Sequence, residues 1–302
     1  MPEDLIRIHR DATGTPHVQA TTDDGAFYGL GWATASDRRF QLALTARAVQ
    51  GRLSEVLGAE YVDEDREARV MMLWKAAQRK AEGLDAETVA LLQAYADGIN
   101  AWTKAQDSLP LLDEAGIVPD HWTVAHVLAS WHALARHFSI GAQKEANLRV
   151  DFDADAAKLG EDAAVEAWLD SLHPGVPSAG VVQLGDIDED YVNAVNDYAA
   201  SVGYGVGDVR TMIASPEEGP HFSHVFAVSG KRTASGKALL VADPQLAVQL
   251  PSTWYEFQLE SPSFRVRGVG VPGSPGIAIG FNEHVAWGIT AGGGDQSDLF
   301  RL

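Results

Sequence analysis

Two stretches of the sequence hold residue types that could carry out chemistry, and the first surrounds Ser223. It is HFSHVFAVSG, residues 221–230, in which Ser223 and His224 precede an apolar alternation that predicts a buried strand. A serine at the start of a strand is most often structural. The alternative is a nucleophile, because residues 202–220 form a predicted loop that is long enough to be cut. A cut beside Ser223 would make it a chain end.

The second stretch is TAGGGDQSD, residues 290–298. Glycines allow a backbone N–H to approach a reacting oxygen, as the stabilisation of an oxyanion requires. Asp295 and Asp298 carry hard oxygen ligands that suit calcium. A solvated acidic turn explains these residues equally well, so a calcium-binding module stays an open interpretation.

Several common motifs are excluded. Residues 268–273 satisfy a GxGxxG pattern, but a dinucleotide loop must open a helix, and the prolines and the strand GIAIGF that follow forbid one. The pairs His121/His126 and His132/His137 are spaced by five residues, off a common helix face, so we predict surface or core histidines and not zinc ligands. The sequence has no cysteine and no GxSxG motif, which leaves no cysteine nucleophile and no support for an α/β-hydrolase serine.

The elements that would position these residues fall into three parts. Residues 1–150 are predicted to be mostly helical, with a strand at 6–11 and helices over 23–57, 85–104 and 122–138. Residues 151–222 combine acid clusters with Gly, Ser and Pro, as is typical of a spacer. Residues 223–302 are predicted to be all-β, with the following strands after the one at Ser223: 237–243, 254–260, 264–271, 276–281 and 284–289.

The charge of the chain limits its classes of partner. The formal net charge is −19 over 302 residues. Nucleic-acid binding needs clustered Lys and Arg, and anionic membrane surfaces repel an acidic protein, so neither is expected as a partner. No signal peptide is visible, and no apolar run approaches the length of a membrane helix.

Three blocks of the sequence, in order, resemble the penicillin acylase family of N-terminal nucleophile hydrolases. The opening block IRIHRDATGTPHVQATTDDGAFYGLGWATASDRRFQLALTARAVQGRLSEVLG is similar to the start of that family's α chain. SHVFAVSGKRTASGKALLVADPQL resembles the start of its β chain, and PGSPGIAIGFNEHVAWGITAGGGDQSDLF resembles a later β-chain block. The resemblance implies an α+β fold, in which an α-rich N-terminal region packs on part of an αββα sandwich.

The resemblance assigns the nucleophile to Ser223 and a self-catalysed cut to the bond between Phe222 and Ser223. The cut frees the α-amino group of Ser223, whose pKa near 8 leaves part of it neutral at neutral pH. That amine can then act as the base for the hydroxyl of the same residue, through a water. His224 stands where the family usually has Asn, so its hydrogen bonds to the leaving group are expected to differ.

Other positions match the family's functional residues. Gln245 matches the residue that supports the nucleophile, and Ala291 matches the donor of a backbone N–H to the oxyanion hole. The acyl-pocket positions match Leu246, Ile279, Ile289 and Gly293. The calcium positions match Asp295, Ser297, Asp298 and, with a one-residue shift, Glu145, so the resemblance implies structural Ca²⁺.

The resemblance predicts an acylase that hydrolyses small N-acyl substrates such as β-lactam side chains or acyl-homoserine lactones, with self-processed α and β chains. Family members continue for several hundred residues beyond the β region 223–302, so we expect a truncated sequence. The alternative function is therefore a catalytically incomplete fragment or assembly subunit that needs a complementary β-chain fragment. Family members are often periplasmic or extracellular, but the sequence does not assign a compartment.

Overall fold

The computed structural model describes residues 5–138, 150, 152–165, 223–244, 246 and 250–290. The chain divides into two compact units, one made of residues 1–138 and 223–292 and the other of residues 139–222 and 293–302. Within the second unit, residues 152–159 and 161–165 are helical. Every element named below belongs to the first unit.

Two long helices form the centre of the helical layer. Helix α1, Asp23–Gln50, begins at Thr22, whose side chain accepts a hydrogen bond from the amide of Gly25, and it ends at Gly51 in the left-handed conformation. Helix α5, Ala86–Lys104, begins at Asp85, whose carboxylate accepts the amide N–H of Thr88. The remaining helices are α2 (Ser54–Leu57), the 3₁₀ helix η1 (Ala59–Tyr61), α3 (Val62–Val70), α4 (Leu73–Glu82), α6 (Pro110–Glu114) and α7 (Val124–Phe138).

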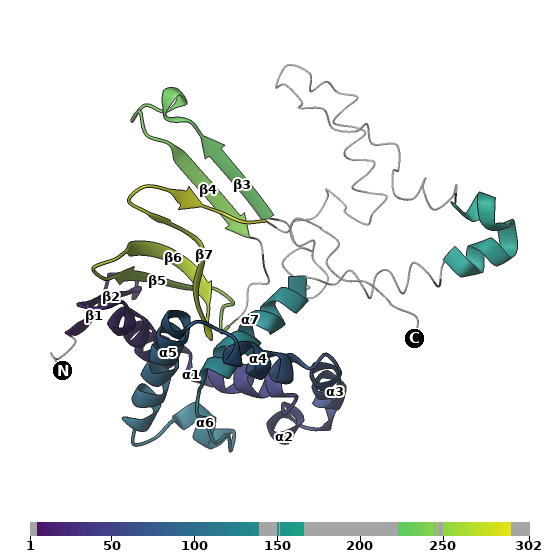
Figure 1. Ribbon diagram of the computed structural model, residues 1–302, viewed down its shortest axis with the longest axis horizontal. Helices are drawn as coiled ribbons and strands as arrows, with labels where there is room; N and C mark the ends of the chain where they lie inside the picture. The colour runs from purple at the N-terminus through teal and green to yellow at the C-terminus, as the bar shows by residue number, and fades with distance from the viewer. Residues whose placement is uncertain are drawn as a thin grey trace. The chain divides into compact units, whose positions relative to one another are not determined.

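Helices α1 and α5 pack side by side (Figure 1) because glycines remove side chains from their contact. A Cβ on Gly31 of α1 would lie 2.0 Å from the carbonyl oxygen of Tyr95, and one on Gly98 of α5 would lie 2.0 Å from that of Tyr28. Either methyl group would force the backbones apart. The contact therefore depends on both glycines.

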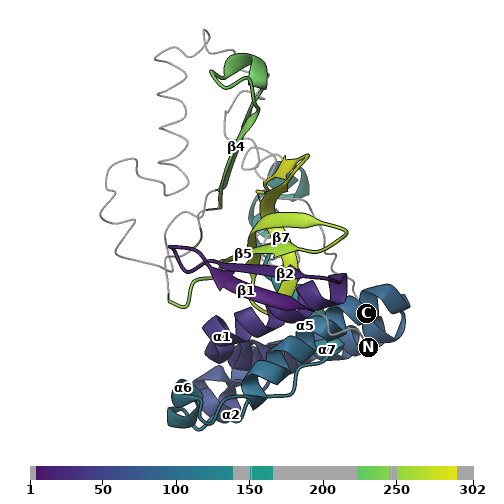
Figure 2. The same cartoon turned by 90° about the vertical axis from the view of Figure 1, so that its left-hand side faces the viewer.

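A six-stranded sheet has the order β1-β2-β5-β6-β7-β8. Its strands are β1 (Ile6–Arg10), β2 (Pro16–Ala20), β5 (Tyr255–Glu260), β6 (Arg265–Val271), β7 (Ser274–Asn282) and β8 (Ala286–Trp287). Neighbouring strands are antiparallel except β2 and β5, which pair in parallel from His17↔Gln258 to Gln19↔Glu260. Figure 2 shows this sheet lying over the helices. Residues far apart in the sequence thus share one sheet.

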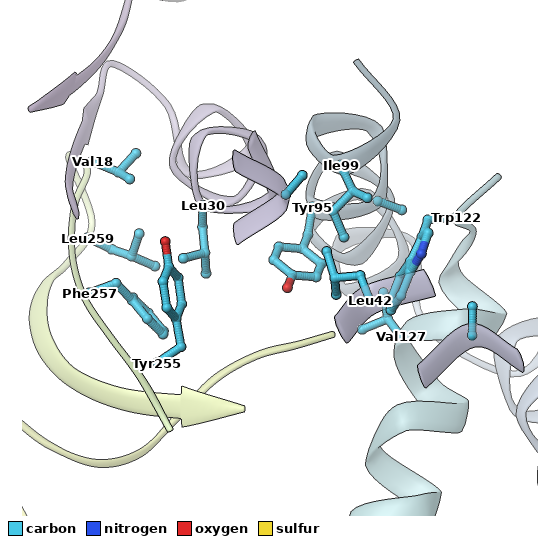
Figure 3. Packing of buried hydrophobic residues seen from close by; sticks show 13 residues of the cluster. Val18, Leu30, Leu42, Tyr95, Ile99, Trp122, Val127, Tyr255, Phe257 and Leu259 are labelled. Carbon is cyan, nitrogen blue, oxygen red and sulfur yellow. The ribbon is translucent and has the colours of Figure 1, made fainter. Parts of the chain in front are cut away.

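The main core lies between this sheet and the helices, as Figure 3 shows. Strand β5 alternates, with Tyr255, Phe257 and Leu259 buried and the residues between them more exposed. These side chains pack with Val18 of β2, with Trp122 just before α7, and with apolar residues of the helices, namely Leu30, Leu42, Tyr95, Ile99 and Val127. Burial of this apolar surface stabilises the contact between the two layers.

A separate two-stranded sheet carries Ser223. Strand β3, Ser223–Val228, pairs in antiparallel register with β4, Leu239–Pro244. The connection contains the 3₁₀ helix η2 (Gly230–Arg232) and Gly236, whose φ of 69° is readily adopted by glycine in a turn.

The fold confirms the predicted α+β class and corrects several details. The predicted helix over 23–57 is two helices that end at Gly51 and Gly58. Strand β2 is not among the predicted strands, because PHVQA is only five residues long; it forms an antiparallel hairpin with β1 and also pairs with the remote strand β5. The GxGxxG stretch lies in the antiparallel hairpin of β6 and β7 and opens no helix, as predicted.

Candidate active site around Ser223

Ser223 is the first residue of β3 and is half-buried. It lies directly opposite Pro244, the last residue of β4, so the two ends of the hairpin meet at the candidate nucleophile. Side chains alternate across a strand, which places Ser223 on the same face as Val225 and, across the ladder, Ala242. We call the face that carries Ser223 the inner face of the hairpin.

The segment that follows β8 contacts this inner face. A Cβ on Gly288 would lie 2.6 Å from the Cβ of Ala242 and 3.2 Å from a methyl carbon of Val225. Only a glycine permits this approach without a shift of the backbone. Residues just before the predicted oxyanion position 291 are thus held against the strand that begins with Ser223.

His224 lies on the opposite face, which we call the outer face. It is exposed and stands opposite Asp243 in the ladder. Its ring is stacked on that of Phe226, with centroids 5.9 Å apart and planes inclined by 7°. His224 and Ser223 therefore point to opposite sides of β3, so His224 would act near the reacting groups only at its backbone.

The outer face also carries large apolar side chains that are exposed. The exposed fractions are 58% for Phe226, 39% for Val228, 56% for Leu239 and 58% for Val241. The sequence predicted a buried strand here, and that prediction is wrong for the described structure. An apolar alternation indicates that one face of a strand is suited to burial. Within the described residues, however, no element covers the outer face of the hairpin.

Three of the predicted acyl-pocket residues are described. Leu246 is half-buried, and its amide N–H donates to the carbonyl oxygen of Pro244 at 3.0 Å, which keeps it beside the end of β4. Ile279 lies on β7 opposite Val269, and Ile289 follows Gly288 and is 51% exposed. Leu246 lies just after β4 and Ile289 just after the Gly288 contact, so both come from segments that adjoin the hairpin.

The other predicted site residues lie outside the described residues. They are Phe222, Gln245, Ala291, Gly293, Glu145, Asp295, Ser297 and Asp298. Among the residues that the structure does describe, no group of three or more His, Cys, Asp or Glu side chains could hold a metal ion. Calcium therefore stays a prediction. No described helix is long and apolar enough to cross a membrane.

The sequence does not reveal two residues of α1 that contact the segment leading into β5. Asp37 and Arg38 lie in the middle of α1 and contact Tyr255 and its neighbours at the start of β5. The signal was present as a charged pair between the apolar positions Ala33 and Phe40. Periodicity alone does not reveal which remote segment such a pair contacts.

Comparison with known proteins identifies the family. The sequence profile described as penicillin amidase matches residues 6–302. The chain belongs to the penicillin amidase family. This match covers both the helical part that supplies α1 and the β part that begins at Ser223.

Named acylases are among the relatives of this penicillin amidase family member. It is 30% identical over 300 residues to the acyl-homoserine lactone acylase QuiP of Pseudomonas aeruginosa, an alignment that covers 98% of the chain and 34% of the relative. It is 29% identical to the penicillin acylase 2 proenzyme of Pseudomonas sp., covering 98% of the chain and 37% of the relative. It is 27% identical to the penicillin G acylase of Escherichia coli, covering 98% of the chain and 40% of the relative.

The fold is similar to that of a solved family member. A structure of the thermostable penicillin G acylase from Alcaligenes faecalis matches with a TM-score of 0.52 and 25% identity, over 60% of this chain and 97% of that chain. The α+β fold is therefore that of a penicillin acylase, an N-terminal nucleophile hydrolase. The chain spans 34% to 40% of the length of the curated relatives named above.

Proposed function

We propose that this chain is an amide-bond hydrolase whose nucleophile is Ser223, exposed by cleavage of the chain before that residue. The observation that carries the proposal is the place of Ser223 as the first residue of β3, half-buried and in register with Pro244. Membership of the penicillin amidase family and the acylase names of its relatives support it.

The proposed cleavage before Ser223 needs no reactant other than water. The Ser223 hydroxyl attacks the carbonyl carbon of Phe222, the C–N bond breaks, and the Phe222 acyl group moves to the serine oxygen as an ester. Water hydrolyses this ester, which leaves a carboxylate on Phe222 and a free amine and hydroxyl on Ser223. One residue then holds both nucleophile and base, which a serine hydroxyl needs because it is a weak nucleophile alone.

The same groups carry the proposed reaction on a substrate. The α-amine accepts the hydroxyl proton through a water, the oxygen attacks the acyl carbon, and the amine product leaves as the acyl-enzyme forms. Water then releases the acid. Leu246, Ile279 and Ile289 offer apolar contacts for the acyl group, which fits N-acyl substrates of the kinds that the relatives' names give, acyl-homoserine lactones and penicillins.

The cut is tested by intact-mass measurement and N-terminal sequencing of the purified full chain after incubation. Two fragments with a new N-terminus at Ser223 are expected for the wild type. Ser223→Ala removes the attacking oxygen and should stay intact, whereas Ser223→Cys retains a nucleophile and should still be cut. A wild-type chain that stays intact and inactive on acyl amides would contradict the proposal.

We also propose that Glu145, Asp295, Ser297 and Asp298 bind a structural calcium ion. Carboxylate and carbonyl oxygens are the ligands that calcium prefers, and the ion would hold the segments that carry them together. Titration calorimetry with calcium on the wild type and on Asp295→Ala tests this. Equal heats for the two proteins would contradict the assignment.

A second candidate function is that of a subunit that becomes active only with a complementary β-chain segment. The exposed outer face of the hairpin favours it, because a contiguous apolar face of Phe226, Val228, Leu239 and Val241 is typical of a surface that another element covers. A chain that hydrolyses acyl amides as a monomer, measured by light scattering during turnover, would exclude this candidate.

A further inference from the structure

Helix α1 is interrupted at Arg38, whose φ of −133° and ψ of 23° are not helical. The two residues at this kink, Asp37 and Arg38, both reach the start of β5. They contact opposite parts of one side chain, Tyr255: Asp37 binds its hydroxyl group, and Arg38 lies over its ring. We call Asp37, Arg38 and Tyr255 the kink clamp.

Asp37 contributes the hydrogen-bonded part of the clamp. Tyr255 Oη donates to Asp37 Oδ2 at 2.7 Å, and Arg10 of β1 donates to both carboxylate oxygens at 2.8 Å. Burial, together with the Asp37 carboxylate, raises the pKa of the Tyr255 hydroxyl well above its ordinary value. Tyr255 thus remains a hydrogen-bond donor throughout the pH range in which proteins are studied.

Arg38 contributes the part that reaches the backbone. Its Nη1 donates to the carbonyl oxygen of Ser252 at 3.1 Å and its Nη2 to that of Trp254 at 3.4 Å. Its guanidinium carbon lies 5.6 Å from the centroid of the Tyr255 ring, within the range of a cation–π contact. A planar guanidinium can make all three contacts at once, whereas a lysine ammonium cannot.

The residues held by the clamp join the candidate active site to the main sheet. Ser252 and Trp254 precede β5, and the same connection begins at Pro244, which lies opposite Ser223. Leu246 lies in that connection, and its amide N–H donates a hydrogen bond to the carbonyl oxygen of Pro244. The hairpin forms a separate sheet, so this connection is one of its covalent links to the core.

We propose that Arg38 is a positioning residue, which acts through the backbone of Ser252 and Trp254 to set the place of β4 and hence of Ser223. The proposal rests on the proposed function. It goes further in assigning control of the cut and of acyl selectivity to a helix that lies before the cut. After cleavage the clamp joins two separate chains, because Arg38 belongs to one and Tyr255 to the other.

The clamp itself is tested by hydrogen exchange on the full chain, which requires no activity. Arg38→Met removes the donors and retains the length of the side chain. Loss of hydrogen bonds to a charged group should speed exchange of a peptide covering residues 250–256 by about tenfold or more. Arg79→Met is the control, because Arg79 is an exposed arginine on α4 with no described part in the clamp. Equal exchange in Arg38→Met and wild type would overturn the proposal.

The effect on the reaction is tested by two readouts, the rate of the cut and the preference between two substrates. Displacement of β4 should slow the cut before Ser223 in Arg38→Met by about tenfold, followed by intact mass. The second readout is the ratio of kcat/KM for a phenylacetyl and an octanoyl amide of one chromogenic amine. Because this ratio does not depend on the fraction of folded protein, a shift of about threefold or more indicates a changed site and not a loss of stability.

The variants separate the possible outcomes. Arg38→Lys keeps the positive charge but loses the planar set of guanidinium donors. It should therefore restore less than half of the cutting rate that Arg38→Met loses. Full restoration by lysine would overturn the role of the guanidinium group. Faster exchange with unchanged cutting and an unchanged substrate ratio would show a purely structural clamp and overturn the positioning role. A wild type that is neither cut nor active would overturn the proposed function, with exchange still deciding whether Arg38 holds residues 250–256.

Discussion

Gly288 approaches Ala242 so closely that a methyl group on residue 288 would lie 2.6 Å from the Ala242 Cβ. Two Cβ atoms cannot be this close, and neither is the end of a flexible side chain that could move aside. The segment after β8 is therefore fitted to the inner face of the hairpin, beside the strand that starts at Ser223.

Gly288→Ala should displace this segment from the hairpin. Overpacking of this kind costs about 1–3 kcal/mol, and the displacement should also slow the proposed cut before Ser223. Denaturant unfolding measures the first effect and intact mass the second. Gly83→Ala is the control, because the nearest atom to its new Cβ is the carbonyl oxygen of Lys80 at 3.8 Å. Equal unfolding and cutting in both variants would contradict the contact.

The Asp65 carboxylate stabilises the start of α2. It accepts the amide N–H groups of Leu53 at 2.6 Å and of Ser54 at 2.9 Å, together with the Ser54 hydroxyl. Burial raises the pKa of Asp65, but these hydrogen bonds outweigh it and hold the pKa below its ordinary value. The stabilisation is thus present above the unfolded pKa and is lost as the pH falls through the lowered folded value.

Asp65→Asn keeps the shape but removes the charge and one acceptor oxygen. We expect it to lower the free energy of unfolding by about 2 kcal/mol near neutral pH, and by much less in strong acid. Urea unfolding at several pH values measures this. Asp63→Asn, an exposed carboxylate on the same helix α3, should change the free energy by less than about 0.5 kcal/mol. A similar loss in both variants would show a general charge effect.

The sequence predicted the elements that their own residues specify and missed those that depend on other parts of the chain. Helix α5 and strands β5 to β7 were predicted because their own apolar periodicity specifies them. Strand β2 was missed because its five residues carry only a weak pattern of their own; its hairpin partner β1 is local, but its place inside the sheet depends on β5, more than 200 positions away. Helix α3 was missed because VDEDREARV has almost no apolar stripe, and only Asp65 is buried.

The candidate site shows the same division. The place of Ser223 at the start of a strand follows from the local pattern, and the structure confirms that strand. Its burial does not follow, because an apolar alternation carries no information about which element covers it. The clamp of Asp37 and Arg38 on Tyr255 joins positions 218 residues apart in its hydrogen bond and cannot be inferred from either segment alone.

His126 makes the helical layer sensitive to acid. It is 5% exposed, and its Nδ1 accepts the amide N–H of Thr123 at 3.2 Å. This hydrogen bond requires that Nδ1 carry no proton. Its ring also contacts the Trp74 ring, with centroids 4.5 Å apart. Burial lowers the pKa of His126 to about 4; the Asp120 carboxylate opposes this shift, whereas His121 and Arg52 lower the pKa further.

Because the folded pKa lies below the unfolded value, the unfolded chain binds the extra proton as the pH falls. The free energy of unfolding should therefore decrease between about pH 6.5 and pH 4, by up to about 1.4 kcal/mol per pH unit from this residue. His126→Gln cannot take up a proton and should lack this part of the slope. Denaturant unfolding at half-unit pH steps measures both slopes, with His284→Gln, an exposed histidine before β8, as the control. Parallel profiles for wild type and His126→Gln would contradict the assignment.

Phe226 and Phe257 allow the exposure of the hairpin's outer face to be measured. Phe226 is 58% exposed and Phe257 is 2% exposed, so the same truncation should have very different costs. Phe226→Ala should change the free energy of unfolding by less than about 0.5 kcal/mol, whereas Phe257→Ala should lower it by about 3–5 kcal/mol. Phe226→Ala should also reduce the binding of a fluorescent apolar dye, because it removes accessible apolar surface. A loss of several kcal/mol in Phe226→Ala would show that a partner or a second copy already covers this face in solution, and light scattering of the same sample would distinguish an oligomer from a monomer.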